Sequence, residues 1–156
     1  MTEQPTAPAA PTATLVPPLP LPDHVRNFLD DLRYATISTI DPDGTPRQAV
    51  IWYTVDGDEI VINSAVGRRW PSNLLRDPRM SLSVIDGNDG YRWVGMTGDV
   101  ATITDHATTQ ADIAGMARRY HADEPGALER ALTRFARQDR ISFRFRAAGL
   151  YDHLDS

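Results

Sequence analysis

The segment from Gly67 to Arg79, GRRWPSNLLRDPR, gathers four arginines in a chain whose formal net charge is −5. Arg68 and Arg69 stand at the start of a predicted helix, where free backbone N–H groups and the helix dipole favour an anion. Two guanidinium groups there can bind a phosphate through paired hydrogen bonds. The pattern therefore indicates either an anion-binding site or a solvated basic surface, and composition alone leaves both open.

The other two arginines of this segment lie at or beyond the C-terminal end of the predicted helix rather than at its start. Arg76 and Arg79 are therefore expected to pair with Asp77, with Asp86 or with solvent. We predict a structural role for them, separate from that of the first arginine pair.

Four aromatic residues lie close in sequence to this segment, in or beside the strands predicted before and after it. A flat conjugated ring needs apolar or aromatic walls, which such side chains supply. Ordinary core packing remains the alternative, above all for Trp52 and Trp93. The aromatic set consists of Trp52, Trp70, Tyr91 and Trp93.

Several classes of chemistry lack their residues. The chain has no cysteine and no lysine, which excludes disulfides, thiolate ligands, Schiff bases and a P-loop lysine. The four histidines stand far apart, so no metal site is predicted. No serine lies in a Gly-x-Ser-x-Gly motif. A sequence pI near 5.2 argues against broad nucleic-acid binding.

The chain divides into an N-terminal arm and one domain. Residues 1–22 are rich in proline, alanine and threonine and nearly uncharged, which favours a disordered arm. This arm lacks the basic start and continuous apolar stretch of a signal peptide. Residues 23–156 are expected to form a single domain. With no apolar run long enough to span a bilayer, we expect a cytoplasmic protein without membrane contact.

Periodicity predicts strands joined by tight turns. Residues 34–40, 46–55 and 59–65 are expected to form an antiparallel meander, with turns at 41–44 and 56–58. Further strands are predicted at 79–86, 91–104 and 140–146, and Gly95 and Gly98 suggest bends of a barrel. In the last strand, Ile141, Phe143 and Phe145 alternate with Ser142, Arg144 and Arg146, which predicts one buried face and one exposed face.

Helical periodicity accounts for the remaining segments. A short amphipathic helix is predicted over residues 22–33, with Asp23 as its N-cap. A second helix is expected over 71–77, and two longer ones over 105–121 and 124–138. The expected fold class is α+β: an antiparallel barrel of five or six strands with peripheral helices.

These segments together resemble a known family. The stretch YATISTIDPDGTPRQAVIWYTVDGDEIVINSAVGRRWPSNLLRDPRMSLSVID, followed by GYRWVGMTGDVATI, is similar to the pyridoxamine-phosphate-oxidase-like split barrels. Within them it looks most like the branch that uses the deazaflavin coenzyme F420. The resemblance covers about Val25 to Tyr151. Its most specific piece is N-L-x-R-D-P-R, from Asn73 to Arg79, after a Gly-Arg-Arg loop.

The resemblance implies a homodimer with two cofactor sites at the subunit interface. It implies that Arg68 and Arg69 hold the cofactor phosphate. The cofactor ring is then expected along two strands, against Val50, Ile51, Trp52, Asn63 and Ser64.

The rest of the implied site lies outside those two strands. Trp70 and Asn73 complete the cofactor-binding set, and Tyr91 and Trp93 are expected on the pocket wall of the partner subunit. Trp70 occupies a position where many relatives carry lysine, so phosphate binding would rest on the two arginines of the loop.

The activity implied is hydride transfer between coenzyme F420 and a small unsaturated or quinone-like molecule. No side chain is assigned a catalytic role, and the proton donor is left open among a bound water, Tyr91 and the cofactor. Two alternatives remain: an FMN-binding oxidoreductase of the same fold, and a non-catalytic barrel that binds or sequesters a cofactor.

Overall fold

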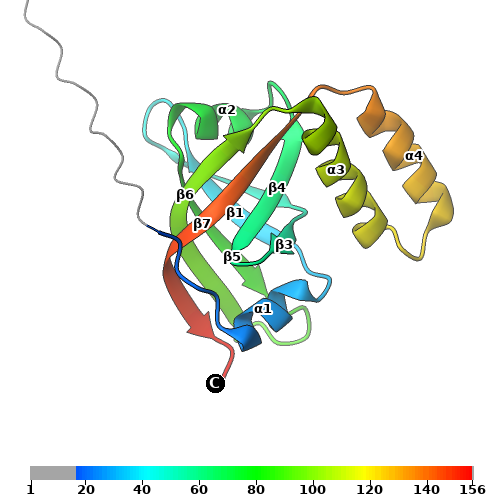
Figure 1. Cartoon of the computed structure of the whole chain (residues 1–156). Helices are drawn as coiled ribbons and strands as arrows, with labels where there is room; N and C mark the ends of the chain where they lie inside the picture. Colours follow the sequence, from blue (N-terminus) through cyan, green and yellow to red (C-terminus); the bar gives the residue numbers. More distant parts are fainter. Residues whose placement is uncertain (1–16, 156) are drawn as a thin grey trace, which may run out of the picture.

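The computed structural model describes residues 17–155, which form one curled sheet with four helices (Figure 1). Residues 1–16 of the predicted arm lie outside this range. The elements follow one another as α1 (Asp23–Asp30), β1 (Ala35–Ile40), β2 (Pro46–Ile51), β3 (Thr54–Asp56), β4 (Glu59–Ala65), α2 (Arg69–Arg76), β5 (Arg79–Ile85), β6 (Trp93–Ile103), α3 (His106–Tyr120), α4 (Pro125–Ala136) and β7 (Arg140–His153).

The connectivity of the sheet forces it to curl into a barrel. Seven strands lie in the order β2-β1-β5-β6-β7-β4-β3, and each neighbouring pair is antiparallel. The two edge strands, β2 and β3, are separated by only two residues, which span about 11 Å at most. A flat sheet would put these edges roughly 29 Å apart. The expected α+β split barrel is thus confirmed, with seven strands in place of the five or six expected.

The predicted continuous strand over residues 46–55 was wrong, because it breaks at Trp52 and Tyr53. The backbone N–H of Tyr53 donates to the hydroxyl of Tyr120 on α3 at 3.2 Å, in place of a strand partner. The Tyr53 hydroxyl donates to the carbonyl of Leu29 at 2.8 Å. The predicted three-strand meander was right in its two hairpins, β1 with β2 and β3 with β4, but because the middle strand breaks, β4 pairs with β3 and β7 and not with β2.

Strand β7 is the longest and continues well past the predicted end at residue 146. It pairs with β6 along nearly its whole length, with a bulge between Thr97 and Gly98. A Cβ on Gly98 would lie 1.9 Å from the carbonyl oxygen of Arg146, so no larger residue fits there. The bend predicted from this glycine is therefore real, and its cause is a close backbone approach.

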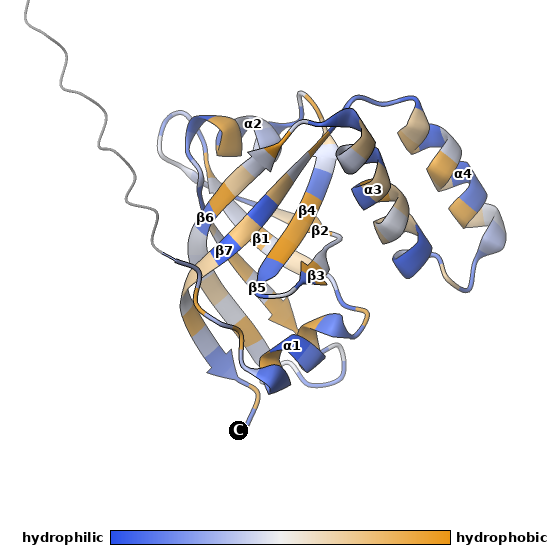
Figure 2. Cartoon of the chain, in the orientation of Figure 1, coloured by the Kyte–Doolittle hydropathy of each residue, from blue (hydrophilic) through white to orange (hydrophobic). Residues whose placement is uncertain are grey.

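The core has two parts, on opposite sides of β4. Ile60 and Ile62 face the barrel interior, whereas Val61 packs against a second cluster formed with α3 and α4. Figure 2 shows the apolar middle of β4 and the mixed polar and apolar surfaces of both helices. The predicted helix face of Ile113, Met116 and Tyr120 is buried.

At the start of the last strand, the predicted solvent face is covered by α3. Ser142 is fully buried and donates to a carboxylate oxygen of Asp112 at 2.7 Å. Its hydroxyl also accepts a hydrogen bond from the side-chain amide of Asn63 at 2.9 Å. The expectation of an exposed Ser142 was wrong because strand alternation does not show that a helix will pack on the second face.

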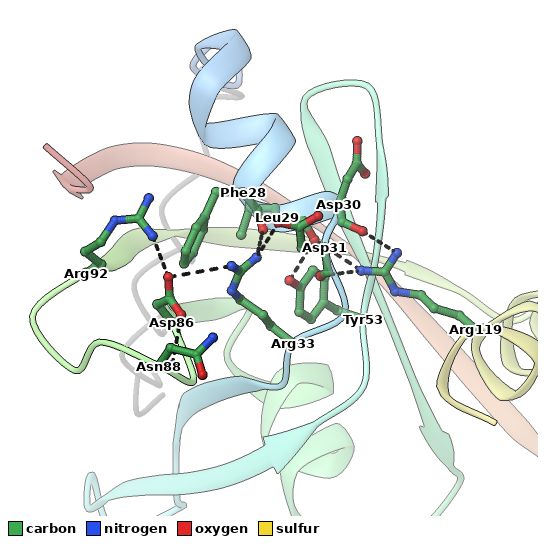
Figure 3. Close-up of polar contacts among 10 residues, drawn as sticks. All are labelled: Phe28, Leu29, Asp30, Asp31, Arg33, Tyr53, Asp86, Asn88, Arg92 and Arg119. Carbon is green, nitrogen blue, oxygen red and sulfur yellow. Dashed lines mark hydrogen bonds and ion pairs between the residues drawn. The ribbon is translucent and has the colours of Figure 1, made fainter. Parts of the chain in front are cut away.

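Helix α1 is fixed by groups that bind its C-terminal carbonyls (Figure 3). Arg119 of α3 donates to the carbonyls of Leu29, Asp30 and Asp31 at 2.9–3.2 Å. Arg33 lies 3.9 Å from the ring of Phe28. The arginines thereby supply N–H donors to carbonyl acceptors that a helix end leaves unsatisfied.

The start of α1 differs from the prediction. Asp23 is the first helical residue, not the N-cap, and the N-cap position is Pro22. Just before it, the side chain of Leu21 is buried in the core, and the backbone N–H of Leu19 donates to the carbonyl of Ala147. None of the helices within residues 17–155 is long and apolar enough to cross a membrane.

Candidate functional site

A cavity of about 500 Å³ lies where the ends of β2 and β4 meet α2, α3, α4 and the start of β7. Seven of the nine predicted cofactor-binding residues line it: Val50, Ile51, Trp52, Asn63, Ser64, Arg68 and Trp70. Six further residues complete the lining: Tyr34, Ile113, Arg134, Phe135, Gln138 and Arg140.

Aromatic side chains hold the walls of this cavity in place. The indole of Trp52 stacks on Tyr120 with centroids 4.9 Å apart and an interplanar angle of 4°. The edge of Phe135 meets the same indole at 6.1 Å. On the other side, Trp70 packs against Phe143 of the barrel core at 5.9 Å. Two tryptophans therefore border the cavity in orientations set by their neighbours.

Three arginines from distant parts of the chain converge on the cavity. Arg140 is 5% exposed, and its Nε donates to Oδ1 of Asn63 at 2.8 Å. Burial, then repulsion from Arg68 and Arg134, lowers the pKa of the Arg140 guanidinium to about 10. Within residues 17–155, none of the three forms an ion pair with a carboxylate. Such an arrangement attracts an anion.

A buried hydroxyl on the same wall also lacks a partner. Ser64 is 2% exposed, and its Oγ makes no hydrogen bond with any described residue. Its neighbour Asn63 is fully engaged, since its amide donates to the carbonyl of Thr109 at 3.0 Å and to Ser142. An orphaned buried hydroxyl in a cavity wall is a hydrogen-bonding group for a ligand.

The loop that carries Arg68 is shaped by the residue before it. Gly67 has φ of +89°, a conformation that other residues rarely adopt. Helix α2 starts at Arg69, with Arg68 as an N-cap that makes no side-chain capping bond. The guanidinium of Arg68 is consequently available to the cavity.

The two remaining predicted cofactor residues lie elsewhere. Arg69 binds Asp41 at 3.2 Å, and the amide of Asn73 donates to the same carboxylate at 2.9 Å. Asn73 is buried, and neither residue lines the cavity. As predicted, Arg79 pairs with Asp77 at 2.7 Å.

Arg76 binds the C-terminal end of β1 rather than a carboxylate. It donates to the carbonyl of Ile40 and to Oδ1 of Asn73. Arg76, the last residue of α2, and Arg79, which follows the helix, thus both have structural partners.

Tyr91 and Trp93, the predicted wall of the partner subunit, are remote from this cavity in the described chain. Tyr91 is 79% exposed. Trp93 stacks on Tyr151 at 4.9 Å and borders a second cavity of about 530 Å³ on the outer surface of the sheet.

Sequence reasoning missed Arg134 and Arg140, the two cavity arginines outside the Gly-Arg-Arg loop. In the sequence, Arg140 looks like the first of several outward-facing arginines of the last strand. Only the packing of α3 and α4 buries its side chain beside Asn63. No local pattern carries that information.

No metal site is indicated: among residues 17–155, no group of three or more histidine, aspartate or glutamate side chains is placed to hold an ion. Nor does the cavity lining contain a carboxylate or a histidine. The lining offers cationic groups for an anion, aromatic surfaces, and hydrogen-bonding groups that include the hydroxyls of Ser64 and Tyr34.

Comparisons with known proteins agree with this fold. The family model of pyridoxamine 5'-phosphate oxidase matches residues 21–152, so the chain belongs to that family. The resemblance noted in the sequence is thereby confirmed. A search of curated proteins gave no significant match.

Solved structures include several similar chains. One described as an F420 reductase is 25% identical, with a TM-score of 0.67, covering 84% of this chain and 98% of that one. A conserved hypothetical protein from Mycobacterium tuberculosis is 23% identical, with a TM-score of 0.70 and 87% coverage of both chains. The heme storage protein HutZ from Vibrio cholerae is 18% identical, with a TM-score of 0.62, covering 86% of this chain and 95% of that one. The last two show the fold alone.

Proposed function

We propose that this protein is an F420-dependent oxidoreductase that transfers hydride between coenzyme F420 and a small unsaturated or quinone-like molecule. The observation that carries the proposal is the cavity itself, in which aromatic walls stand beside three arginines without carboxylate partners. The similarity to a structure described as an F420 reductase supports the choice of cofactor.

The residues of the cavity fit a planar cofactor that carries an anion. Arg68, Arg134 and Arg140 would hold its phosphate. Ile51, Trp52 and Trp70 would bound its ring, and the orphaned hydroxyl of Ser64 would hydrogen-bond a polar edge. When bound, the coenzyme supplies the hydride chemistry. The protein's part is orientation and exclusion of water, so no acid–base pair is needed.

We further propose that the protein acts as a homodimer. The outer surface of the sheet carries the aromatic stack of Trp93, Tyr151 and His153, together with a cavity bordered by small polar residues of β1 and β5. Exposed aromatic groups of this kind commonly mark protein–protein contacts. Sedimentation equilibrium tests this: a single monomer species over the whole concentration range would contradict it.

Tryptophan fluorescence gives a direct test of the cofactor. Trp52 and Trp70 line the cavity, whereas Trp93 lies on the outer surface, so a Trp93→Phe variant makes the signal specific to the site. Titration of that variant with coenzyme F420 should quench its emission, and FMN should quench it more weakly.

Stronger quenching by FMN than by F420 would show that the protein is instead an FMN-binding protein, and the proposed activity would become that of an FMN-binding oxidoreductase. If F420 binds but reduced F420 passes no hydride to any of a panel of quinones and enones, the protein is a cofactor-binding barrel without catalysis. The heme storage function of one structural neighbour makes that outcome worth measuring.

A further inference from the structure

A chain of side-chain hydrogen bonds connects the outside of α3 to the cavity. Oδ2 of Asp112 accepts from the hydroxyl of Ser142 at 2.7 Å, and Oγ of Ser142 accepts from the amide of Asn63 at 2.9 Å. Oδ1 of Asn63 in turn accepts from Nε of Arg140 at 2.8 Å. Asp112 is partly exposed, whereas the other three side chains are buried. We call these four residues the Asp112 relay.

The direction of every bond in the relay is fixed by chemistry. An ionised carboxylate only accepts hydrogen bonds, so the hydroxyl proton of Ser142 goes to Asp112 and its oxygen accepts from Asn63. The carbonyl of Thr109 also accepts from the Asn63 nitrogen, at 3.0 Å. The amide oxygen of Asn63 must therefore face Arg140, whose guanidinium can only donate. The relay thus holds Asn63 in the one orientation that binds this arginine.

The relay leaves one nitrogen of the Arg140 guanidinium for the cavity. Nε donates to Asn63, Nη1 donates to Oε1 of Gln138 at 2.6 Å, and Nη2 makes no hydrogen bond with any residue that the structure describes. Because the guanidinium is planar and rigid, fixing two of its nitrogens fixes the direction of the third. This support is needed, since Arg140 is buried and repelled by Arg68 and Arg134.

The two ends of the relay carry opposite charges, with two polar groups aligned between them. Among residues 17–155, no cation forms an ion pair with Asp112. The O–H group of Ser142 and the amide of Asn63 both turn their negative ends toward Arg140. Such a chain of polarised hydrogen bonds stabilises a distant charge. A carboxylate in direct contact with Arg140 would instead occupy the place of a bound anion.

We propose that Asp112 is a positioning residue of the anion site, which acts through Ser142 and Asn63 to hold Arg140 in the orientation that binds the ligand. The inference rests on the proposed function only for the identity of that ligand. Asp112 itself does not line the cavity. Long-range electrostatics alone predicts that loss of this carboxylate strengthens anion binding, because the protein becomes less acidic. Loss of the relay predicts the opposite sign.

The test is a titration of the full-length protein with orthophosphate, followed by proton–nitrogen NMR. Asp112→Ala should weaken phosphate binding about two- to tenfold, the range that one hydrogen bond contributes. Asp112→Asn keeps an acceptor oxygen without the charge and should recover part of the affinity. Asp123→Asn is the matched control: it removes one exposed carboxylate between α3 and α4 and should leave the affinity unchanged or slightly raised.

The Nε–H signal of Arg140 reports on the relay even without bound phosphate. Its assignment follows from its absence in Arg140→Met. In Asp112→Ala this proton should exchange with solvent faster than in the wild type, because Asn63 is no longer held against it. Asp123→Asn should leave the exchange rate unchanged.

A double-mutant cycle separates positioning from a general loss of structure. In the Arg140→Met background, Asp112→Ala should no longer change phosphate affinity. In the Arg118→Met background its full effect should persist, because Arg118 is an exposed arginine of α3 outside the cavity lining. Additive losses, unchanged or tighter binding in Asp112→Ala, or an unchanged Nε–H exchange rate would each overturn the proposal.

The outcome is distinguishable from that of the proposed function. If these effects appear while neither F420 nor FMN quenches the tryptophan emission, the proposed function fails and the positioning role stands. If F420 binds equally well to the wild type and to Asp112→Ala, the proposed function stands and the positioning role fails.

Discussion

Two arginine clusters flank helix α2, and adjacent residues of the chain belong to different ones. In the Asp41 cluster, Arg47, Arg69 and Asn73 surround a carboxylate that is 4% exposed. In the cavity cluster, defined by Arg68, Arg134 and Arg140, no carboxylate lies among the lining residues. The comparison teaches that the function of clustered arginines depends on whether the protein supplies their counter-ion.

Each cluster lowers the pKa of its central group, but the effect on the charged form of that group is opposite in the two cases. Hydrogen bonds from Arg47, then from Asn73 and Arg69, hold the pKa of the Asp41 carboxyl well below its usual range. Burial and neighbouring cations lower the pKa of Arg140. The Asp41 cluster thus stabilises its own charges, whereas the cavity cluster destabilises its own and is stabilised by an added anion.

The largest expected effect is on the cavity cluster. Arg140→Met should weaken the binding of phosphate-bearing ligands roughly 10- to 100-fold, since a hydrogen bond to a charged group contributes about 1.5–3 kcal/mol. Calorimetric titration measures this, with Arg118→Met as control. The unfolding temperature without ligand should fall less than in Asp41→Asn, because the loss of the hydrogen bond to Asn63 is offset by the removal of a buried charge that lacks a counter-ion. Unchanged affinity would contradict the role of Arg140.

The opposite result is expected for the Asp41 cluster. Asp41→Asn should lower the unfolding temperature more than any single substitution at the cavity, because Arg47 and Arg69 would lose their shared carboxylate. Ligand affinity at a permissive temperature should stay within about threefold of wild type. Scanning calorimetry measures the unfolding temperature, and calorimetric titration measures the ligand affinity. A large loss of affinity in Asp41→Asn would show that the two clusters are not independent.

The pH dependence of stability follows from the depressed pKa of Asp41. A carboxyl whose folded pKa is lowered contributes stability above its unfolded value, about 3.9, and that stability is lost as the pH falls below it. The urea midpoints of wild type and Asp41→Asn should therefore differ at pH 6 and converge as the solution is acidified below about pH 4. A difference independent of pH would mean that the charge of Asp41 is not what stabilises the fold.

The smallest effects should separate the two neighbouring arginines. Arg68→Gln should weaken ligand binding about tenfold and leave stability unchanged. Arg69→Gln should change stability by less than about 1 kcal/mol, as its side chain is 62% exposed, and should leave binding near wild type. Paired titrations and urea melts of both variants decide this. Equal losses of affinity in Arg68→Gln and Arg69→Gln would show that Arg69 also belongs to the cofactor site.

The local parts of the fold could be predicted from sequence because their signals are local. The Asp41–Gly44 turn joins β1 to β2, and the turn around Gly57 joins β3 to β4, both as antiparallel hairpins. The two long helices appear where apolar periodicity put them. The pairing of β4 with β7 was missed, because about 75 residues separate the two strands and no turn signal spans that distance.

The sequence by itself determined the class of fold, the resemblance to the family and the loop that carries Arg68. The tertiary structure alone decided which arginines lack a counter-ion. Arg69 and Arg140 look alike in sequence, but one meets Asp41 and the other is buried beside Arg68 and Arg134. The physical reason is that the electrostatic environment of a side chain depends on groups close in space, which the curled sheet and the packing of α3 and α4 bring together from distant parts of the chain.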